Sequence, residues 1–462
     1  MTCTRRHVLA STAVLALSSR ILPAHAAGST PRDWLVRWLA AFNAGDAAVY
    51  PAFVRQNIRP LVPYLDEDLG MREGSGGFIL LRTEETGPRE ITAWLRDRNW
   101  DRFSKVVLTI GADGIDDLSF AGAPDPHGFA IPRLSERDAL AALRRTLRAE
   151  ATAGRLSGAV LVAKRGKVLL REAYGAQDAT GARPVTAATR FCIGSAGKMF
   201  TAVGVLQLVQ QGRLRLTDTI AMRLPDYPDT SLAREVSVRH LLTHSGGTGD
   251  FFGPDYETHA AELLTPSDFI LRFGRRDTLF PPGSRWGYSN FGFILLGALI
   301  ERASGQRWDA YLKRNVFDVA GMTETSPVAT AADTARPLTG SAETGLKSLP
   351  YYPGLPAGGG YSTVDDLHRF AIALRSGALL DAEPLRWLTT ASIPAGSASW
   401  SFGLRIATRN GAPYYGHGGS APGVNADIAF YPAGYTVIAL ANRGHPHALN
   451  IGAYAGNRLP LR

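Results

Sequence analysis

The chain has 462 residues, of which 45% are hydrophobic and 20% are charged, a composition typical of a globular protein with two or three domains. Its formal net charge is +9, but the basic residues are scattered rather than gathered in a stripe, which indicates a solvated basic surface and excludes a nucleic-acid site. Only six of the 50 Lys and Arg residues are lysines, so each lysine position is informative.

The first residues have the pattern of an export signal. Arg5 and Arg6 precede an apolar run of about ten residues, and Ala24-His25-Ala26 supplies the small residues of a cleavage site. The run is far shorter than the roughly 20 residues that cross a bilayer as a helix. We therefore predict a signal peptide over residues 1–26, with a twin-arginine signal favoured over a plain secretory one. The mature protein would be periplasmic or secreted, with no transmembrane anchor.

Residues 27–125 are predicted to form a small α+β domain. Trp34, Trp38 and Phe42 recur at a helical spacing of four, and Gly45-Asp46 separates them from a second helix. Four runs of strand-forming residues follow, with "TGP" and "GADG" as turn signals. Two helices followed by an antiparallel meander resemble the nuclear-transport-factor-2-like (SnoaL-like) cone. That resemblance implies either a ligand pocket or a surface for contacts.

Residues 126–134 are predicted to be a Pro-rich linker to a second domain over 135–462. Ser135 is the expected N-cap of the next helix, and a strand hairpin should turn at Arg165-Gly166. The middle of this domain reads as mostly helical, most clearly over 290–305, and four strands close the chain. We therefore predict an α+β domain with an antiparallel sheet and a helical insertion.

Ser195 and Lys198 precede a strongly apolar stretch. Residues 199–209 are apolar nearly all round, which predicts a helix in the protein's centre that begins at the serine and ends at Gly212. At a spacing of three, the serine and the lysine face the same side. A serine needs an adjacent base, and a lysine serves only when burial and a helix N-terminus lower its pKa. Arginine does not deprotonate, so the lysine indicates a catalytic pair rather than a solvated helix start.

Three motifs occur in a fixed order: "SAGK" (195–198), "YSN" (288–290) and "HGG" (417–419). They resemble the motifs of the serine β-lactamase and penicillin-binding-protein superfamily, most closely its class C-like branch of DD-peptidases, D-aminopeptidases and esterases. The resemblance covers about 150–460. It implies a β-lactamase/transpeptidase-like fold, in which helices flank an antiparallel sheet and an all-α subdomain is inserted.

The resemblance implies a role for each matching residue. Ser195 would be the nucleophile that forms an acyl-enzyme, and Lys198 would activate it. Tyr288 would be the partner acid/base, with its phenol pKa lowered from about 10 by the nearby ammonium. Asn290 would hold the substrate's amide or the lysine. The backbone N–H groups of Ser195 and Ser420 would form the oxyanion hole.

The "HGG" residues would bind the substrate. A His-x-Gly pattern also occurs at His244, but His417 follows Tyr288 in the chain and precedes a clear strand. Gly418 and Gly419 would leave room for a substrate along the strand edge. Family members that act on penicillins usually have lysine in place of His417, where it anchors the substrate carboxylate. A neutral imidazole is a weaker anchor, which argues against efficient penicillin hydrolysis.

We therefore predict an exported serine hydrolase that cleaves carboxylic esters or D-amino-acid-type amides in a small-molecule or peptide substrate. One alternative is a peptidoglycan DD-peptidase or weak β-lactamase. A second is a non-hydrolytic penicillin-binding-like sensor or scaffold. No cofactor and no metal are expected, because His240 and His244 have the spacing of a metalloprotease helix but no glutamate between them. We expect both histidines to pack in the structure.

Overall fold

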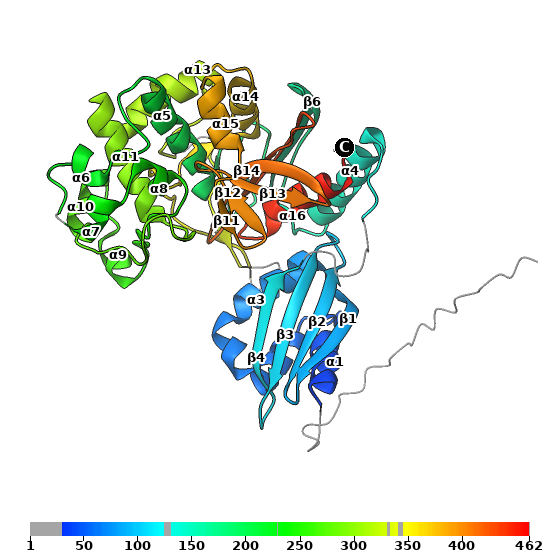
Figure 1. Cartoon of the computed structure of the whole chain (residues 1–462). Helices are drawn as coiled ribbons and strands as arrows, with labels where there is room; N and C mark the ends of the chain where they lie inside the picture. The colour runs from blue at the N-terminus through cyan, green and yellow to red at the C-terminus, as the bar shows by residue number, and fades with distance from the viewer. Residues whose placement is uncertain (1–29, 124–130, 229, 330–332, 341–344, 462) are drawn as a thin grey trace, which may run out of the picture.

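The computed structural model describes residues 30–123, 131–228, 230–329, 333–340 and 345–461. The predicted signal peptide and most of the predicted linker lie outside these residues. Figure 1 shows a small domain, with its sheet in blue and cyan, beside a larger domain that holds the rest of the chain. Within the described ranges no helix combines the length and the apolar character needed to cross a membrane.

The small domain is an antiparallel meander covered by helices. Its sheet has the order β1-β2-β3-β4, as predicted, and Trp38, Phe42 and Tyr50 fill the space beneath it. A third helix was not predicted, because its sequence buries few apolar side chains. The elements are α1 (Pro31–Phe42), α2 (Val49–Asn57), η1 (Arg59–Tyr64), α3 (Leu65–Ser75), β1 (Phe78–Gly87), β2 (Glu90–Asp97), β3 (Phe103–Ile110) and β4 (Ile115–Gly122).

The larger domain contains an eight-stranded antiparallel sheet in which the first and last strands of the domain pair. The order is β11-β12-β13-β14-β15-β16-β5-β6, so the hairpin predicted at Arg165-Gly166 closes the sheet beside the C-terminal strands. The strands are β5 (Gly158–Lys164), β6 (Lys167–Tyr174), β11 (Ile393–Ala395), β12 (Ala398–Trp400), β13 (Arg405–Arg409), β14 (Ala412–Ala421), β15 (Val424–Phe430) and β16 (Tyr435–Ala441). Two short pairs join β7 (Phe191–Cys192) to β10 (Tyr361–Ser362) and β8 (Leu338–Thr339) to β9 (Lys347–Ser348).

Helices cover both faces of this sheet and fill the region between β6 and β11. Alternate residues of β5 and β16 face opposite cores, as the period of two requires. The two terminal helices of the domain, α4 (Glu136–Thr152) and α16 (His447–Arg458), pack on one face. The others are η2 (Gly194–Gly197), α5 (Lys198–Gln210), α6 (Ile220–Arg223), α7 (Ser231–Glu235), α8 (Val238–Leu242), α9 (Pro254–His259), α10 (Pro266–Phe273), α11 (Asn290–Ser304), α12 (Trp308–Leu312), η3 (Lys313–Phe317), α13 (Asp318–Ala320), α14 (Val364–Arg375) and α15 (Ala382–Thr389).

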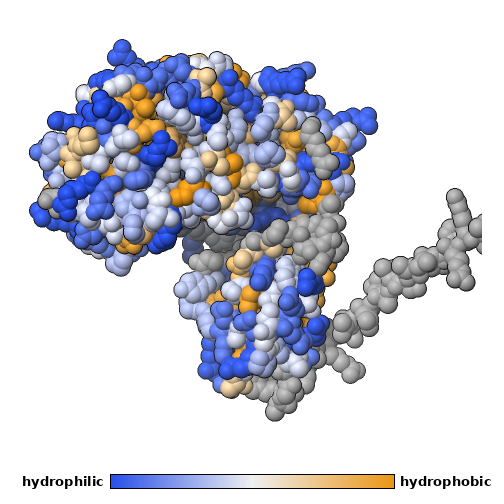
Figure 2. All heavy atoms as spheres, in the orientation of Figure 1, coloured by the Kyte–Doolittle hydropathy of each residue, from blue (hydrophilic) through white to orange (hydrophobic). Residues whose placement is uncertain are grey.

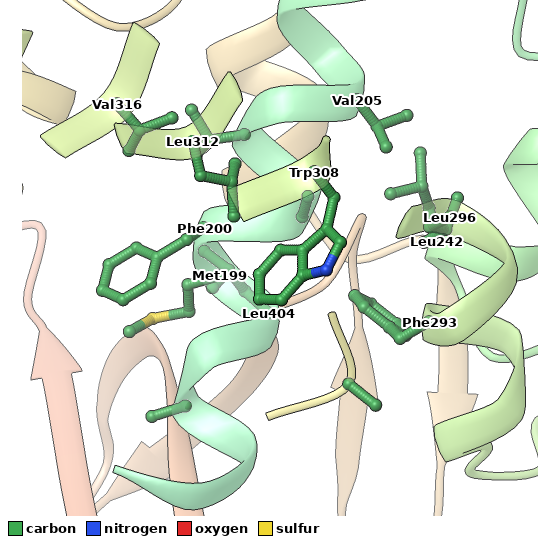
Figure 3. Close-up of a cluster of buried hydrophobic side chains, with 14 of the residues drawn as sticks. Met199, Phe200, Val205, Leu242, Phe293, Leu296, Trp308, Leu312, Val316 and Leu404 are labelled. Carbon is green, nitrogen blue, oxygen red and sulfur yellow. The ribbon is translucent and has the colours of Figure 1, made fainter. Parts of the chain in front are cut away.

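Helix α5 is the predicted central helix. Figure 3 shows Phe200 next to Leu312 and Val316, while Phe293 of α11 lies on the opposite side. The residues from 198 to 208 are all buried. The serine is not part of this helix, contrary to the prediction: Ser195 lies in the 3-10 turn η2 just before it. Lys198, the first residue of this helix, is therefore surrounded by protein.

Strand β14 runs against the turn that carries Ser195. A Cβ on Gly419 would lie 1.9 Å from the Ile193 carbonyl oxygen, much closer than atoms can approach. A Cβ on Gly418 would lie 3.2 Å from the Ala426 carbonyl oxygen, a tight but adjustable contact. Gly419 is therefore needed by the protein's own backbone. Both glycines line the cavity beside Ser195, and their role in leaving room for substrate stays a prediction.

Gly419→Ala should separate β14 from the serine turn. We expect it to lower the free energy of unfolding by about 1–3 kcal/mol, as overpacking does, whereas the matched variant Gly418→Ala should lower it by less than about 1 kcal/mol. Urea denaturation of the two variants measures both values. Equal stability of the two variants would contradict the contact.

Candidate active site

The amine of Lys198 lies between Ser195 and two oxygen acceptors. Its Nζ is 3.2 Å from Ser195 Oγ and 2.6 Å from Asn290 Oδ1, and it also donates to the Ala357 carbonyl. The side chain is completely shielded from solvent. The structure thus brings Ser195 and Lys198 of the "SAGK" motif together with Asn290, the first residue of α11. The fourth partner, Ala357, lies in a glycine-rich loop before β10.

Burial makes this amine a base at neutral pH. It lowers the pKa of Lys198 from 10.5 to about 7, while the charge of Asp250 acts in the opposite direction. A neutral amine has two N–H donors and one lone pair. Because Asn290 and Ala357 accept the two N–H groups, the lone pair is left for the hydroxyl of Ser195.

Asp250 fixes the orientation of the asparagine. Asn290 Nδ2 donates to Asp250 Oδ2 at 2.7 Å, so the amide must present its Oδ1 to the lysine. Of the two contacts expected for Asn290, the described structure shows the one with the lysine. Sequence reasoning missed Asp250, since it lies 40 residues before Asn290 in a loop with no motif of its own.

Tyr288 lies over the same amine. Lys198 Nζ is 4.9 Å from the centre of the phenol ring, and the phenol hydrogen-bonds to the Ser195 side chain. Burial raises the pKa of Tyr288 above 10, and the hydrogen bond to Ser195 only partly opposes this effect. The expected decrease was wrong, because the loss of solvent and the charge of Asp250 both raise the pKa of Tyr288. Tyr288 is therefore a protonated phenol at neutral pH.

His244 packs against this tyrosine. The two rings lie 4.4 Å apart at 30°, and His244 Nδ1 accepts the backbone N–H of Ser289 at 3.2 Å. Burial lowers the pKa of His244 well below its usual value, so the ring is neutral. Its neighbour His240 caps the start of α8 at Ser237. His244 thus packs in the site, and His240 has a capping role. The described residues contain no cluster of three or more potential metal ligands.

His417 also lies in the site as a neutral ring. Its Nδ1 is 2.5 Å from the Gly418 carbonyl oxygen, and its ring meets Trp400 edge-on at 5.1 Å. Burial, together with the charge of Lys198, lowers the pKa of His417 to about 3. His417 therefore provides no positive charge for a substrate carboxylate.

The free edge of β14 faces the serine. Strand β13 pairs with β14 only as far as Gly416, and among the described residues no other strand pairs with that edge beyond it. A Cβ on Gly194 would lie 3.1 Å from the Ser420 backbone nitrogen, so that amide is adjacent to the serine turn. The oxyanion-hole role of the Ser195 and Ser420 amides stays a prediction.

Two cavities meet at Ser195. One, of about 330 Å³, extends along β14 past Trp400, His417 and Arg405. The other has a volume of about 470 Å³ and a wall of aromatic side chains. Sequence reasoning missed this wall, although the stretch "DFF" (250–252) contains two of its residues. Ser195, Tyr288 and Ser420 line both cavities; the aromatic wall consists of Phe251, Phe252, Tyr256 and Tyr352.

An accessible serine beside a buried neutral lysine and a protonated phenol is the site of a serine hydrolase. Comparison with known proteins agrees with this class. The family model described as Beta-lactamase matches residues 143–459, and the chain belongs to that family. The small N-terminal domain lies outside the match.

Similar proteins include enzymes and penicillin-binding proteins. Esterase EstB of Burkholderia gladioli is 32% identical over 251 residues, which cover 51% of this chain and 60% of the esterase. Penicillin-binding protein 4 of Amycolatopsis lactamdurans is 28% identical over 285 residues, which cover 56% of this chain and 74% of that protein. The crystal structure of a penicillin-binding protein from Bacillus halodurans has a TM-score of 0.59 and 30% identity, and it covers 66% of this chain and 96% of its own. Other matches span as little as 35% of the relative.

The pH dependence of hydrolysis should report the amine. A base works unprotonated, so kcat/KM should fall about tenfold per pH unit below about 7, the pKa of Lys198. Asp250→Asn removes the charge that raises this pKa, so the decrease in kcat/KM should begin at a lower pH. Protonation of His417 cannot cause this decrease in kcat/KM, because its pKa is about 3.

The matched control is Lys198→Arg, which keeps the charge but cannot supply a neutral base. It should lose activity by about 10⁴ or more, the scale of losing a catalytic group. An active Lys198→Arg enzyme would show that another group is the base. So would a decrease in kcat/KM that begins at a higher pH in Asp250→Asn. Both are read from pH–rate profiles of the purified variants.

Proposed function

We propose that the protein hydrolyses carboxylic esters or D-amino-acid-type amides through an acyl-enzyme on Ser195. The observation that carries the proposal is the Lys198 amine, which has acceptors for both N–H groups and lies 3.2 Å from the serine hydroxyl. A hydroxyl that gives its proton to such a base becomes a nucleophile.

In the proposed acylation step, Ser195 Oγ attacks the substrate carbonyl and its proton moves to Lys198 Nζ. The tetrahedral oxyanion is held by the amides of Ser195 and Ser420. The bond to the leaving group breaks as that group takes the proton of Tyr288. The ammonium of Lys198 then returns a proton to the phenolate, which restores both residues.

In the proposed deacylation step, water attacks the acyl carbon and gives a proton to Lys198. The acyl bond to Ser195 breaks as Oγ regains this proton, and the carboxylic acid leaves. The raised pKa of Tyr288 suits this cycle, because a phenol that stays protonated can donate to a leaving group. A phenol with a lowered pKa would compete with the lysine as the base.

The walls of the cleft support an ester, or an amide without a carboxylate beside the scissile bond. His417 stands uncharged where a cationic anchor would be needed for a penicillin carboxylate. The aromatic wall of Phe251, Phe252, Tyr256 and Tyr352 suits an apolar group on one side of the scissile bond. The similarity to an esterase supports the same assignment.

A side-by-side assay separates this proposal from its alternatives. We expect turnover of p-nitrophenyl esters and its loss by about 10⁶ in Ser195→Ala, with little turnover of nitrocefin or of a D-Ala-D-Ala peptide. Turnover of nitrocefin or of the peptide alone would favour the β-lactamase or DD-peptidase. A sensor or scaffold would turn over none of them, and intact mass after incubation with a fluorophosphonate then shows whether Ser195 reacts at all.

We further propose that the protein acts outside the cytoplasm, after removal of residues 1–26. The twin arginines, the short apolar run and the Ala24-His25-Ala26 site support this. The intact mass of protein purified from the native envelope or medium should correspond to a chain that begins at Ala27. A full-length chain retained in the cytoplasm would contradict the proposal.

A further inference from the structure

The active-site cleft continues toward the small N-terminal domain. The cavity of about 330 Å³ beside Ser195 adjoins another of about 630 Å³, because Arg405, Tyr414 and Leu449 line both. The larger cavity lies between the domains: Arg102 of the small domain and Asn457 of α16 also line it. Figure 1 shows the small domain on the same side of the large domain as β13 and α16.

The segment between β2 and β3 holds the two domains together. Trp100 is buried in a core of the large domain and meets Tyr454 edge-on at 6.0 Å. Asp101 forms an ion pair with Arg458 of α16. Between these contacts and the sheet, Arg102 Nη1 donates to Asn450 Oδ1 at 2.6 Å. The guanidinium of Arg102 is therefore held in place at the wall of the interdomain cavity.

The carboxylates near this cavity are already used by the protein. Asp427 pairs with Arg409 at 2.6 Å, and Asp101 pairs with Arg458. Asp97, near Arg102, is buried and accepts the backbone N–H of Trp100 at 2.6 Å; burial raises its pKa to about 6.

Two cations on this path have no such partner. In the part of the chain that the structure describes, neither Arg102 nor Arg405 has a carboxylate within 4.0 Å, the limit for an ion pair. The charges of Asp97 and Asp427 act on Arg102 from beyond that distance. The side chain of Arg405 donates to the Tyr414 hydroxyl at 3.3 Å. The field of Arg102 reaches the first cavity, since its charge adds to burial in lowering the pKa of His445. The path from Ser195 thus leads from a neutral centre to a positively charged end.

We propose that the N-terminal domain completes the substrate site, and that Arg102, with Arg405, binds a carboxylate carried by the far end of the substrate. The proposal rests on the proposed ester or amide hydrolysis and names its substrate class as acidic and extended. A guanidinium binds a carboxylate through two parallel N–H donors. The charge that His417 lacks beside the scissile bond is then provided at a distance by a residue of the other domain.

Paired substrates test this assignment in the full-length enzyme. Two ester series place a terminal carboxylate on the acyl part or on the alcohol part, with linkers of increasing length, and each acid is matched by its neutral methylamide. In the wild type, kcat/KM for the acid should exceed that for its methylamide by about ten- to a hundredfold in one series, once the linker is long enough. Arg102→Gln should reduce this ratio to about one and leave the methylamide rates within about twofold.

Two further variants separate the effect of the charge of Arg102 from the effect of its contact with Asn450. Arg102→Lys keeps the charge and should keep part of the preference. Asn450→Ala removes the acceptor that holds Arg102 but leaves the guanidinium, so the preference should decrease without disappearing. Thermal unfolding of all three variants shows whether the domains stay folded. If Arg102→Gln does not fold, the acid-to-methylamide ratio of kcat/KM in Arg102→Lys and Asn450→Ala still tests the proposal. Both ratios should be lower than that of the wild type, and ratios equal to the wild-type value would overturn the role of Arg102.

The outcomes also separate this proposal from the general one. Methylamides that are hydrolysed with no preference for the acids at any linker length would overturn the role of Arg102 and leave ester hydrolysis standing. If no ester is hydrolysed, protection of Ser195 from a fluorophosphonate by the same compounds measures binding without turnover. Equal protection by acid and methylamide would then overturn the proposal, and stronger protection by the acid that Arg102→Gln abolishes would support it.

Discussion

The structure depends on one constraint: an uncharged lysine amine must be held in an apolar core with its lone pair directed at a serine. An ammonium is costly to bury without a counter-charge at contact distance. Among the residues that the structure describes, Lys198 contacts no carboxylate; its partners are the Ser195 hydroxyl, the amide oxygen of Asn290 and the carbonyl of Ala357. These neutral acceptors satisfy the amine without stabilising its charged form strongly. Moving Asp250 into contact would restore the proton and remove the base; its place behind Asn290 orients the amide at a distance.

The backbone around the serine is built for close approach. The Ala357 carbonyl reaches the amine because the loop that carries it passes over the serine turn at Gly358, where a Cβ would lie 2.8 Å from the Gly194 carbonyl oxygen. From the other side, β14 comes within reach of the same turn at Gly419. The 3-10 turn of Ser195 thus lies between the loop at Gly358 and the edge of β14, and Lys198 is held by its place in α5. The surface is less specialised: on the face in Figure 2 hydrophilic and hydrophobic residues are interspersed.

Much of this arrangement could be predicted from sequence. Periodicity gave the meander of the small domain and the closing strands, and the apolar run after Ser195 identified the central helix. The order of three short motifs brought Tyr288, Asn290 and His417 to the same site. Contacts between distant loops leave no periodic signal, so Asp250, the aromatic wall and Arg102 were missed. The pKa of Tyr288 was predicted in the wrong direction because the sequence shows the nearby lysine but not the degree of burial at 288. That burial depends on His244 and Trp400, whose rings pack around the phenol.

The most direct test of the central claim is the titration of Lys198 itself. With six lysines in the chain, labelling with lysine enriched in ¹³C at Cε gives a spectrum simple enough to follow by NMR, and the signal absent from Lys198→Arg identifies the residue. Lys198 should titrate with a pKa of about 7, whereas exposed lysines titrate near 10.4. A Lys198 signal that titrates with the exposed lysines would show that the amine is charged at neutral pH, and the account of the site would be wrong.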